Sequence, residues 1–186
     1  MRRLWVCLLV LLFLPGCSSE KELMNEVLLL RRYIQDASEI NLQCRITADY
    51  GNSVCVFGME CKYDSAGNMQ WKVTEPETIA GISGSVKNEK GQFEFDNEML
   101  VFELLTDEQI TPVGAPWILL KVIQSGYVHG CGRDGENILA QFDDSFSNLQ
   151  FSTDVWLSKQ GIPLRGEIIW EGRRIMSIEI CEFEIL

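Results

Sequence analysis

Histidine occurs once in this chain of 186 residues, so any imidazole base would have to be His129. Cys131 follows two residues later, and both side chains point to the same face of an extended strand. Such a pair could form an activated thiol nucleophile, because the imidazole takes up the thiol proton. The spacing supplies no acid to orient the imidazole. We therefore expect a structural or surface role for both residues and no catalytic residue.

Acidic residues cluster at two places that could bind calcium or transfer protons, namely Asp143-Asp144 and Asp134-Gly135-Glu136. Their neighbours are residues that favour turns, so we interpret both clusters as solvated turns. No two cysteines have the C-x-x-C spacing that would indicate a zinc site. No glycine-rich phosphate loop occurs. The sequence predicts neither a metal site nor a cofactor.

The first 17 residues carry a different kind of chemistry, which is covalent modification of a cysteine. Arg2 and Arg3 precede an apolar run over residues 4–14, the arrangement of a secretory signal. That run is too short to cross a bilayer, which needs about 20 residues as a helix. Leu14-Pro15-Gly16-Cys17 resembles a lipobox, which implies cleavage after Gly16 and acylation of Cys17. The alternatives are an ordinary secreted protein cut nearby and an uncleaved anchor.

Residues 17–186 are about the length of one domain. The net charge is −11, and it becomes −13 without residues 1–16, which hold two arginines and no acid. Such a charge repels nucleic acid and anionic lipid headgroups, so we expect no nucleic-acid partner. We expect the acyl anchor, rather than charge, to hold the protein on the extracytoplasmic face of a bacterial cell membrane.

A helix is predicted directly after Cys17. Ser19 and Glu22 have the spacing of a capping box. An apolar stripe of helical period follows and ends near Ala37; its members are Leu23, Val27, Leu30 and Ile34. Because this helix begins two residues after the modified cysteine, the folded body should lie close to the bilayer.

Residues 40–63 predict a β-hairpin, because apolar residues alternate with polar ones on both sides of Gly51-Asn52. If Tyr50 pairs with Ser53, every inward residue meets an apolar partner. This register places Ala48 opposite Cys55, Ile46 opposite Phe57, Cys44 opposite Met59 and Leu42 opposite Cys61.

The same register bears on disulfides. Cys44 and Cys61 become diagonal neighbours, roughly 7–8 Å apart, whereas a disulfide favours Cα atoms about 5.5–6 Å apart. We therefore favour buried thiols over a bridge for Cys44, Cys55 and Cys61. The state of Cys131 and Cys181 is left open by the sequence.

The remainder predicts an antiparallel meander, a buried helix and a second meander. Residues 117–123 (WILLKVI) are apolar nearly all round, with Pro116 before them and Gly126 after them, so this helix should be buried against the sheet. The predicted strands after the hairpin are 69–75, 82–86, 93–95, 99–105, 127–132, 138–142, 149–157, 164–170 and 174–183, with a turn over 88–91.

This order of elements resembles a known superfamily. Residues 67–76 (GNMQWKVTEP) resemble the G-x-x-x-W segment followed by proline of the lipoprotein-carrier, or LolA-like, superfamily. Residues 163–174 are similar to the ending of small lipoproteins of Firmicutes, especially clostridia, that are assigned to it. The resemblance covers nearly all of residues 20–183. It implies a mostly β, α+β fold, in which a curved antiparallel open half-barrel carries the N-terminal helix and has the buried helix on its concave face.

In the carriers that concave face shelters lipid acyl chains. The classic carrier is a soluble shuttle, whereas this chain should remain anchored, so we transfer the fold and an apolar cavity but not the trafficking role. The expected occupant is a lipid or another hydrophobic ligand, bound without catalysis. The expected cavity residues are Leu42, Ile46, Phe57, Met59, Trp71, Val73, Phe93, Phe95, Trp117 and Leu120. The alternative is a protein-interaction or sensing module of the cell envelope with a solid core and no cavity.

Overall fold

The computed structural model describes residues 17–95, 98–104, 110–143 and 151–186. Their elements, in chain order, are α2 (Cys17–Asp36), β1 (Glu39–Asp49), β2 (Val54–Asp64), β3 (Met69–Glu75), β4 (Ser83–Lys87), β5 (Lys90–Phe95), β6 (Glu98–Glu103), the 3-10 helix η1 (Pro112–Gly114), α3 (Ala115–Ser125), β7 (Tyr127–Asp134), β8 (Asn137–Asp143), β9 (Phe151–Leu157), β10 (Pro163–Trp170) and β11 (Arg173–Ile185).

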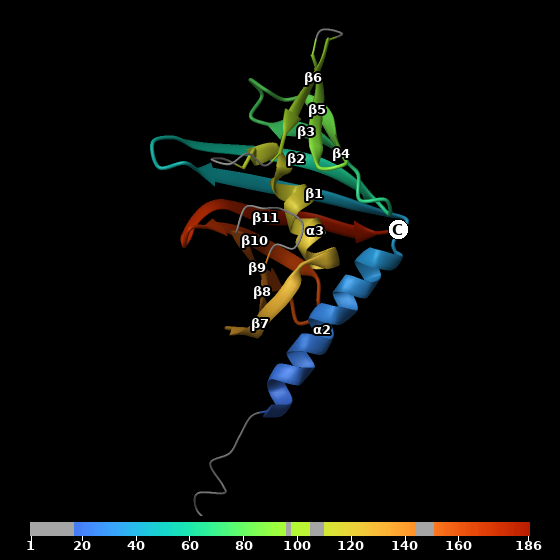
Figure 1. The fold of residues 1–186 in the computed structure, drawn as a ribbon, viewed down its shortest axis with the longest axis vertical. Helices are drawn as coiled ribbons and strands as arrows, with labels where there is room; N and C mark the ends of the chain where they lie inside the picture. Colours follow the sequence, from blue (N-terminus) through green and yellow to red (C-terminus); the bar gives the residue numbers. More distant parts are fainter. Residues whose placement is uncertain (1–16, 96–97, 105–109, 144–150) are drawn as a thin grey trace, which may run out of the picture.

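All the strands form one antiparallel sheet in the order β6-β5-β4-β3-β2-β1-β11-β10-β9-β8-β7. Each half is a meander, and the halves join where β1 pairs with β11. The sheet does not close, because β6 and β7 remain at its edges. Figure 1 shows α3 crossing the middle of the curved sheet, with α2 beside it. The predicted open half-barrel with helices on its concave face is confirmed.

The β1–β2 hairpin has the predicted register, including Cys44 opposite Met59 and Ile46 opposite Phe57. Its turn is also as predicted, because Gly51 has a φ of 85° and the Tyr50 amide donates to the Ser53 carbonyl at 3.0 Å. The apolar residues of β1 are buried at every second position. Period-two hydrophobicity therefore determined the pairing here.

The two helices are held to each other and to the sheet. Eight residues of α3 are buried, as its all-round apolar sequence predicts. Arg31 of α2 donates hydrogen bonds to the carbonyl oxygens of Ile123 (2.7 Å) and Gly126 (2.6 Å) at the end of α3. At the other end of α3, Trp117 Nε1 donates to the Gly67 carbonyl at 2.9 Å. These bonds fix α3 across the concave face.

Two local predictions were wrong. Helix α2 begins at Cys17 rather than after a cap at Ser19, whose side chain lies outside the described residues. The turn predicted over residues 88–91 is shorter: Asn88 and Glu89 have φ values of 50° and 65°, and Lys90 already belongs to β5. A two-residue turn with both φ values positive matches the twist of the strands that it joins.

The buried residues form one cluster that extends from Leu23 to Ile178. Every member of this described core therefore lies within residues 18–186. None of the described helices is long and apolar enough to span a membrane.

Candidate apolar pocket and a polar basin on the opposite face

The ten residues predicted to line a cavity separate into two groups. Five of them are at most 2 % exposed and pack in the core around α3, outside the apolar hollow described next; these are Leu42, Ile46, Met59, Trp117 and Leu120. Four others lie together around a hollow at the β2–β5 end of the sheet; these are Phe57, Trp71, Val73 and Phe93. The side chain of Phe95 lies outside the described residues.

This hollow, which we call the apolar pocket, has a volume of about 560 Å³. Strands β2, β3, β5 and β6 supply one wall, and the loop after β3 and the segment around η1 supply the rest. Its lining is almost entirely apolar and consists of Cys55, Phe57, Trp71, Val73, Ile79, Ile82, Phe93, Phe102, Thr111, Pro112 and Val113. A volume and lining of this kind are typical of small-molecule sites.

The loop that carries Ile79 and Ile82 is folded back onto β3 by backbone hydrogen bonds. The amide of Val73 donates to the Ile82 carbonyl at 2.8 Å, and the amide of Gly81 donates to the Val73 carbonyl at 2.9 Å. Gly81 has a φ of 94°, which favours glycine. These bonds hold both isoleucines at the pocket.

The opposite wall is positioned by Tyr50 from the β1–β2 turn. Its hydroxyl donates a hydrogen bond of 2.6 Å to the carbonyl of Ile110, directly before η1. Burial, assisted by the nearby Cys55, raises the pKa of Tyr50 to about 12. The phenol therefore stays protonated and keeps donating at neutral pH.

Cys55 is exposed, although the sequence predicts a buried thiol. It lies opposite Ala48, as expected, but it borders the apolar pocket together with Phe57. Alternation predicts which face a residue occupies and does not say whether that face is filled.

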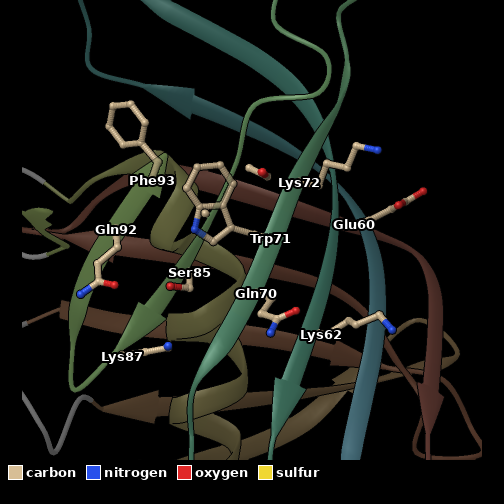
Figure 2. Close-up of a pocket in the computed structure, with 11 residues that line it drawn as sticks. Glu60, Lys62, Gln70, Trp71, Lys72, Ser85, Lys87, Gln92 and Phe93 are labelled. Atoms are coloured by element: carbon tan, nitrogen blue, oxygen red, sulfur yellow. The ribbon is translucent and has the colours of Figure 1, made fainter. Parts of the chain in front are cut away.

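A second hollow, the polar basin, has a volume of about 480 Å³ (Figure 2). It lies on the outer face of the sheet, because its polar side chains alternate along β2 to β5 with the inward side chains that line the apolar pocket. Strands β2 to β5 supply lysine, amide and hydroxyl side chains to it. Its lining consists of Glu60, Lys62, Gln70, Trp71, Lys72, Ser83, Gly84, Ser85, Lys87, Gln92 and Phe93. Trp71 and Phe93 also line the apolar pocket, so the two hollows share these residues.

The residues first considered for catalysis do not form an activated site. His129 Nδ1 lies 3.1 Å from Asp143 Oδ1, and both side chains are largely exposed. The Cys131 thiol donates instead to the Glu20 carbonyl at 3.6 Å. Burial and the charge of Glu20 raise the pKa of Cys131, whereas a nucleophilic thiol needs a lowered one. Asp144 lies outside the described residues.

Asp134 accepts a hydrogen bond of 2.7 Å from Trp156 Nε1, so it has a structural partner. Across the described segments, no group of three His, Cys, Asp or Glu side chains is arranged to hold a metal ion.

Five thiols of the described chain are free. Cys44 and Cys61 are buried, as predicted. A hydrogen bond with the Cys44 thiol and burial raise the pKa of Cys61 well above its ordinary value. The pair therefore behaves as neutral apolar packing.

Sequence reasoning missed much of the pocket wall, including Ile79, Ile82, Phe102 and Val113. Phe102 lies in a predicted strand, and its alternation with Leu100 offered a weak signal. Ile82 begins a predicted strand, although in the structure it lies just before β4. Ile79 lies in a loop and Val113 in η1, for which no periodicity exists.

No family model matches the chain, and no curated protein matches its sequence. Solved structures do match it in shape. A DUF1329 family protein from Desulfovibrio piger is 9% identical, with a TM-score of 0.50 over 89% of this chain and 92% of that one. A LolA superfamily protein from Nitrosomonas europaea is 11% identical, with a TM-score of 0.48 over 87% and 93%.

The lipoprotein LppX from Mycobacterium tuberculosis is 10% identical, with a TM-score of 0.42 over 90% of this chain and 95% of that one. At these identities the likeness concerns the fold alone. The open antiparallel sheet with helices across its concave face agrees with the LolA-like half-barrel that the sequence predicts. The Firmicutes origin stays a prediction.

Proposed function

We propose that this protein is a membrane-anchored lipoprotein of the bacterial cell envelope that binds a lipid or another hydrophobic ligand without catalysis. The observation that carries the proposal is the apolar pocket, whose lining is apolar except for Thr111 and the Cys55 thiol. Large apolar hollows are uncommon in packed proteins, because unfilled space forfeits dispersion contacts. A ligand that fills this space would recover them.

The alternative of an interaction or sensing module predicts a solid core. The core where α3 packs on the sheet is indeed filled, since Met59 of β2 and Trp117 and Leu120 of α3 are at most 2 % exposed. The hollow at the β2–β5 end supports ligand binding over this alternative. The occupant would therefore enter at that end rather than run under α3.

Anchoring would proceed through Cys17, the first residue of α2. A helix rises about 1.5 Å per residue without slack, so acyl chains on Cys17 would be joined rigidly to the domain. A stationary holder of ligand at the membrane surface fits this connection better than a roaming shuttle does. Replacement of Cys17 by alanine should abolish acylation. Mass spectrometry of the purified chain should then detect no lipid-modified form.

Lipid extraction tests the ligand. The full chain, purified from membranes, is extracted with organic solvent, which leaves covalently attached acyl chains on the protein. We expect co-extracted lipid from the wild type and from Ile162→Glu, and much less from Ile79→Glu. Ile79 is 39% exposed and borders the pocket, whereas Ile162 is 49% exposed and does not border it. Equal lipid from all three proteins, or none from the wild type, would contradict the proposal.

A further inference from the structure

Helix α2 has exposed apolar side chains on the side that faces away from the body of the protein. Its inner side carries the buried stripe that includes Leu23 and Ile34. On its outer side, Leu28 is 45% exposed and Leu29 is 40% exposed. Tyr33, four residues after Leu29, lies beside it on the helix surface and is 53% exposed. We call Leu28, Leu29 and Tyr33 the outer stripe.

The position of α2 leaves the outer stripe open to other molecules. Figure 1 shows α2 at the edge of the molecule, with its Cys17 end extending past the sheet. The inner side of the helix is tied to α3, since Arg31 donates two hydrogen bonds to the end of α3 and Gln35 Nε2 donates one of 2.8 Å to the Gln124 carbonyl. These bonds oppose any rotation of α2 that would bury the outer stripe against its own body.

The charges next to the outer stripe are balanced, whereas the whole chain has a net charge of −11. Lys21 and Arg32 are exposed on α2, and so are Glu22 and Asp36. Long charged side chains can keep their heads in water while their stems cover apolar surface. Contact of the outer stripe with an apolar partner therefore requires no burial of an unpaired charge.

The acyl anchor proposed at Cys17 would bring a bilayer next to α2. Cys17 is the first residue of the helix, so no flexible segment separates the acyl chains from the outer stripe. Because a helix rises 1.5 Å per residue, Leu28 lies about 16 Å and Tyr33 about 24 Å along the axis from Cys17. The headgroup layer on each side of a bilayer is only roughly 5–8 Å thick. An upright helix would hold the outer stripe in water, whereas a helix lying on the surface would place it at the apolar boundary.

The anchor also changes how strong this contact has to be. Two contacts on one rigid element make the second one intramolecular, which gives it a high effective concentration. Three partly exposed apolar side chains would not hold a soluble protein on a membrane. On a chain that is already anchored, they are sufficient to favour one orientation.

We propose that the outer side of α2 is a membrane-contact surface, on which Leu28 and Leu29 enter the acyl boundary of the bilayer and Tyr33 lies at the headgroup level. Tyrosine suits that level, because its ring is apolar and its hydroxyl is polar. The anchored helix then lies along the membrane, so the orientation of the domain is fixed as well as its location. This inference rests on the proposed function, since it requires acylation of Cys17.

Photochemical cross-linking to lipid tests this orientation. The full chain is purified from bacterial membranes with p-benzoylphenylalanine in place of Leu29, reconstituted into phosphatidylcholine vesicles and irradiated. Phosphatidylcholine carries no net charge, so general charge attraction cannot explain an adduct. The control carries the same probe in place of Val101, which is exposed on the edge strand β6. We expect about tenfold more lipid adduct at position 29, because an interfacial helix buries its apolar face about 5–10 Å into the acyl boundary.

A second pair of variants tests whether the leucines are responsible. With p-benzoylphenylalanine in place of Tyr33, Leu28→Glu/Leu29→Glu should lose most of the lipid adduct, while the chain still sediments with the vesicles through its anchor. The matched control, Leu100→Glu/Val101→Glu, makes the same change in charge at two consecutive exposed residues of β6 and should keep the adduct. Circular dichroism of each variant verifies that it is folded.

The remaining outcomes separate this inference from the proposed function. Mass spectrometry of the chain measures acylation independently of any adduct. An acylated chain that sediments with the vesicles but forms no lipid adduct at position 29 would overturn the inference and leave the anchor intact. Equal lipid adducts at positions 29 and 101, or a protein–protein adduct at position 29 in place of a lipid adduct, would also overturn it. Absence of acyl chains on the wild type would contradict the proposed anchor and the inference with it.

Discussion

The indole of Trp71 lies against the backbone of Gly84, so that a Cβ atom at position 84 would be 2.5 Å from Trp71 Cζ2. The same atom would collide with the carbonyl oxygen of Gln92, which belongs to the neighbouring strand. Trp71 can occupy this place only because residue 84 has no side chain. The contact holds the Trp71 ring on the inner face of the sheet, where it lines the apolar pocket.

Gly84→Ala should therefore disturb both stability and the pocket. Backbone of β5 and a buried ring would have to move, and overpacking of this kind costs about 1–3 kcal/mol. Gly132→Ala is the control, because no atom lies within 4 Å of its added Cβ. Urea unfolding measures the change in the free energy of unfolding. Equal stability of the two variants would show that the Trp71–Gly84 contact leaves room for a side chain at position 84.

Arg31→Met should destabilise the link between the helices. The guanidinium satisfies two carbonyl groups at the end of α3, where the helix dipole also favours a positive charge. Burial lowers the pKa of Arg31, and the guanidinium remains charged at neutral pH. We expect a loss of about 1–3 kcal/mol in urea unfolding. Arg32→Met, at an exposed position, should change stability by less than about 0.5 kcal/mol.

The cysteines should react with iodoacetamide in a definite order at pH 8. Cys55 and Cys181 are exposed and should be alkylated first. Cys131 should follow more slowly, because its pKa is raised and a thiol reacts as the thiolate. Cys44 and Cys61 should remain protected until urea unfolds the chain. Peptide mass spectrometry identifies each site, and alkylation of Cys61 as fast as that of Cys55 would contradict the described packing.

Stability should decrease in alkaline solution. Burial, with a smaller contribution from Asp64, raises the pKa of Tyr63 to about 12, and Tyr50 is raised similarly. The folded chain then holds protons that the unfolded chain releases above about pH 10. This contribution is fully present below pH 10 and is lost as the pH approaches 12. Urea unfolding at pH 8, 10 and 11 measures it.

Tyr63→Phe is the informative variant for this pH effect. It should have a smaller decrease in unfolding free energy between pH 10 and 11, because one of the two raised groups is absent. It also removes the hydrogen bond of 2.9 Å from Tyr63 to Gln124 Oε1, which lowers stability at every pH. An unchanged alkaline slope would show that Tyr63 does not titrate as described.

The local pattern of apolar and polar residues was sufficient to predict the β1–β2 register and the burial of α3. In the hairpin, the register set by the two-residue turn also places every inward apolar residue opposite another, as it does for Ile46 with Phe57 and Cys44 with Met59. The turn and the alternation of apolar residues therefore predict the same pairing. In α3, apolar residues surround the helix, which leaves only burial as a stable solution. Such predictions depend on residues that are close in sequence.

The pairing of β1 with β11 and the location of the pocket could not be predicted in this way. Ile46 meets Ile178 across the junction, and no local signal selects that partner from the other apolar strands. Ile46 and Phe57 belong to the same inward face, yet Ile46 lies in the filled core and Phe57 borders the hollow. That difference depends on where the loop with Ile79 and the segment around η1 fold, which is tertiary information.

The most direct test of the central claim is calorimetric titration of residues 18–186 with dodecanol, an uncharged apolar probe. We predict saturable binding of one molecule per chain, weakened about tenfold or more by Ile79→Glu, because a charged side chain at the pocket rim opposes apolar burial. Ile162→Glu should bind dodecanol as the wild type does. Absence of saturable binding, or an equal effect of the two substitutions, would contradict a ligand site in the apolar pocket.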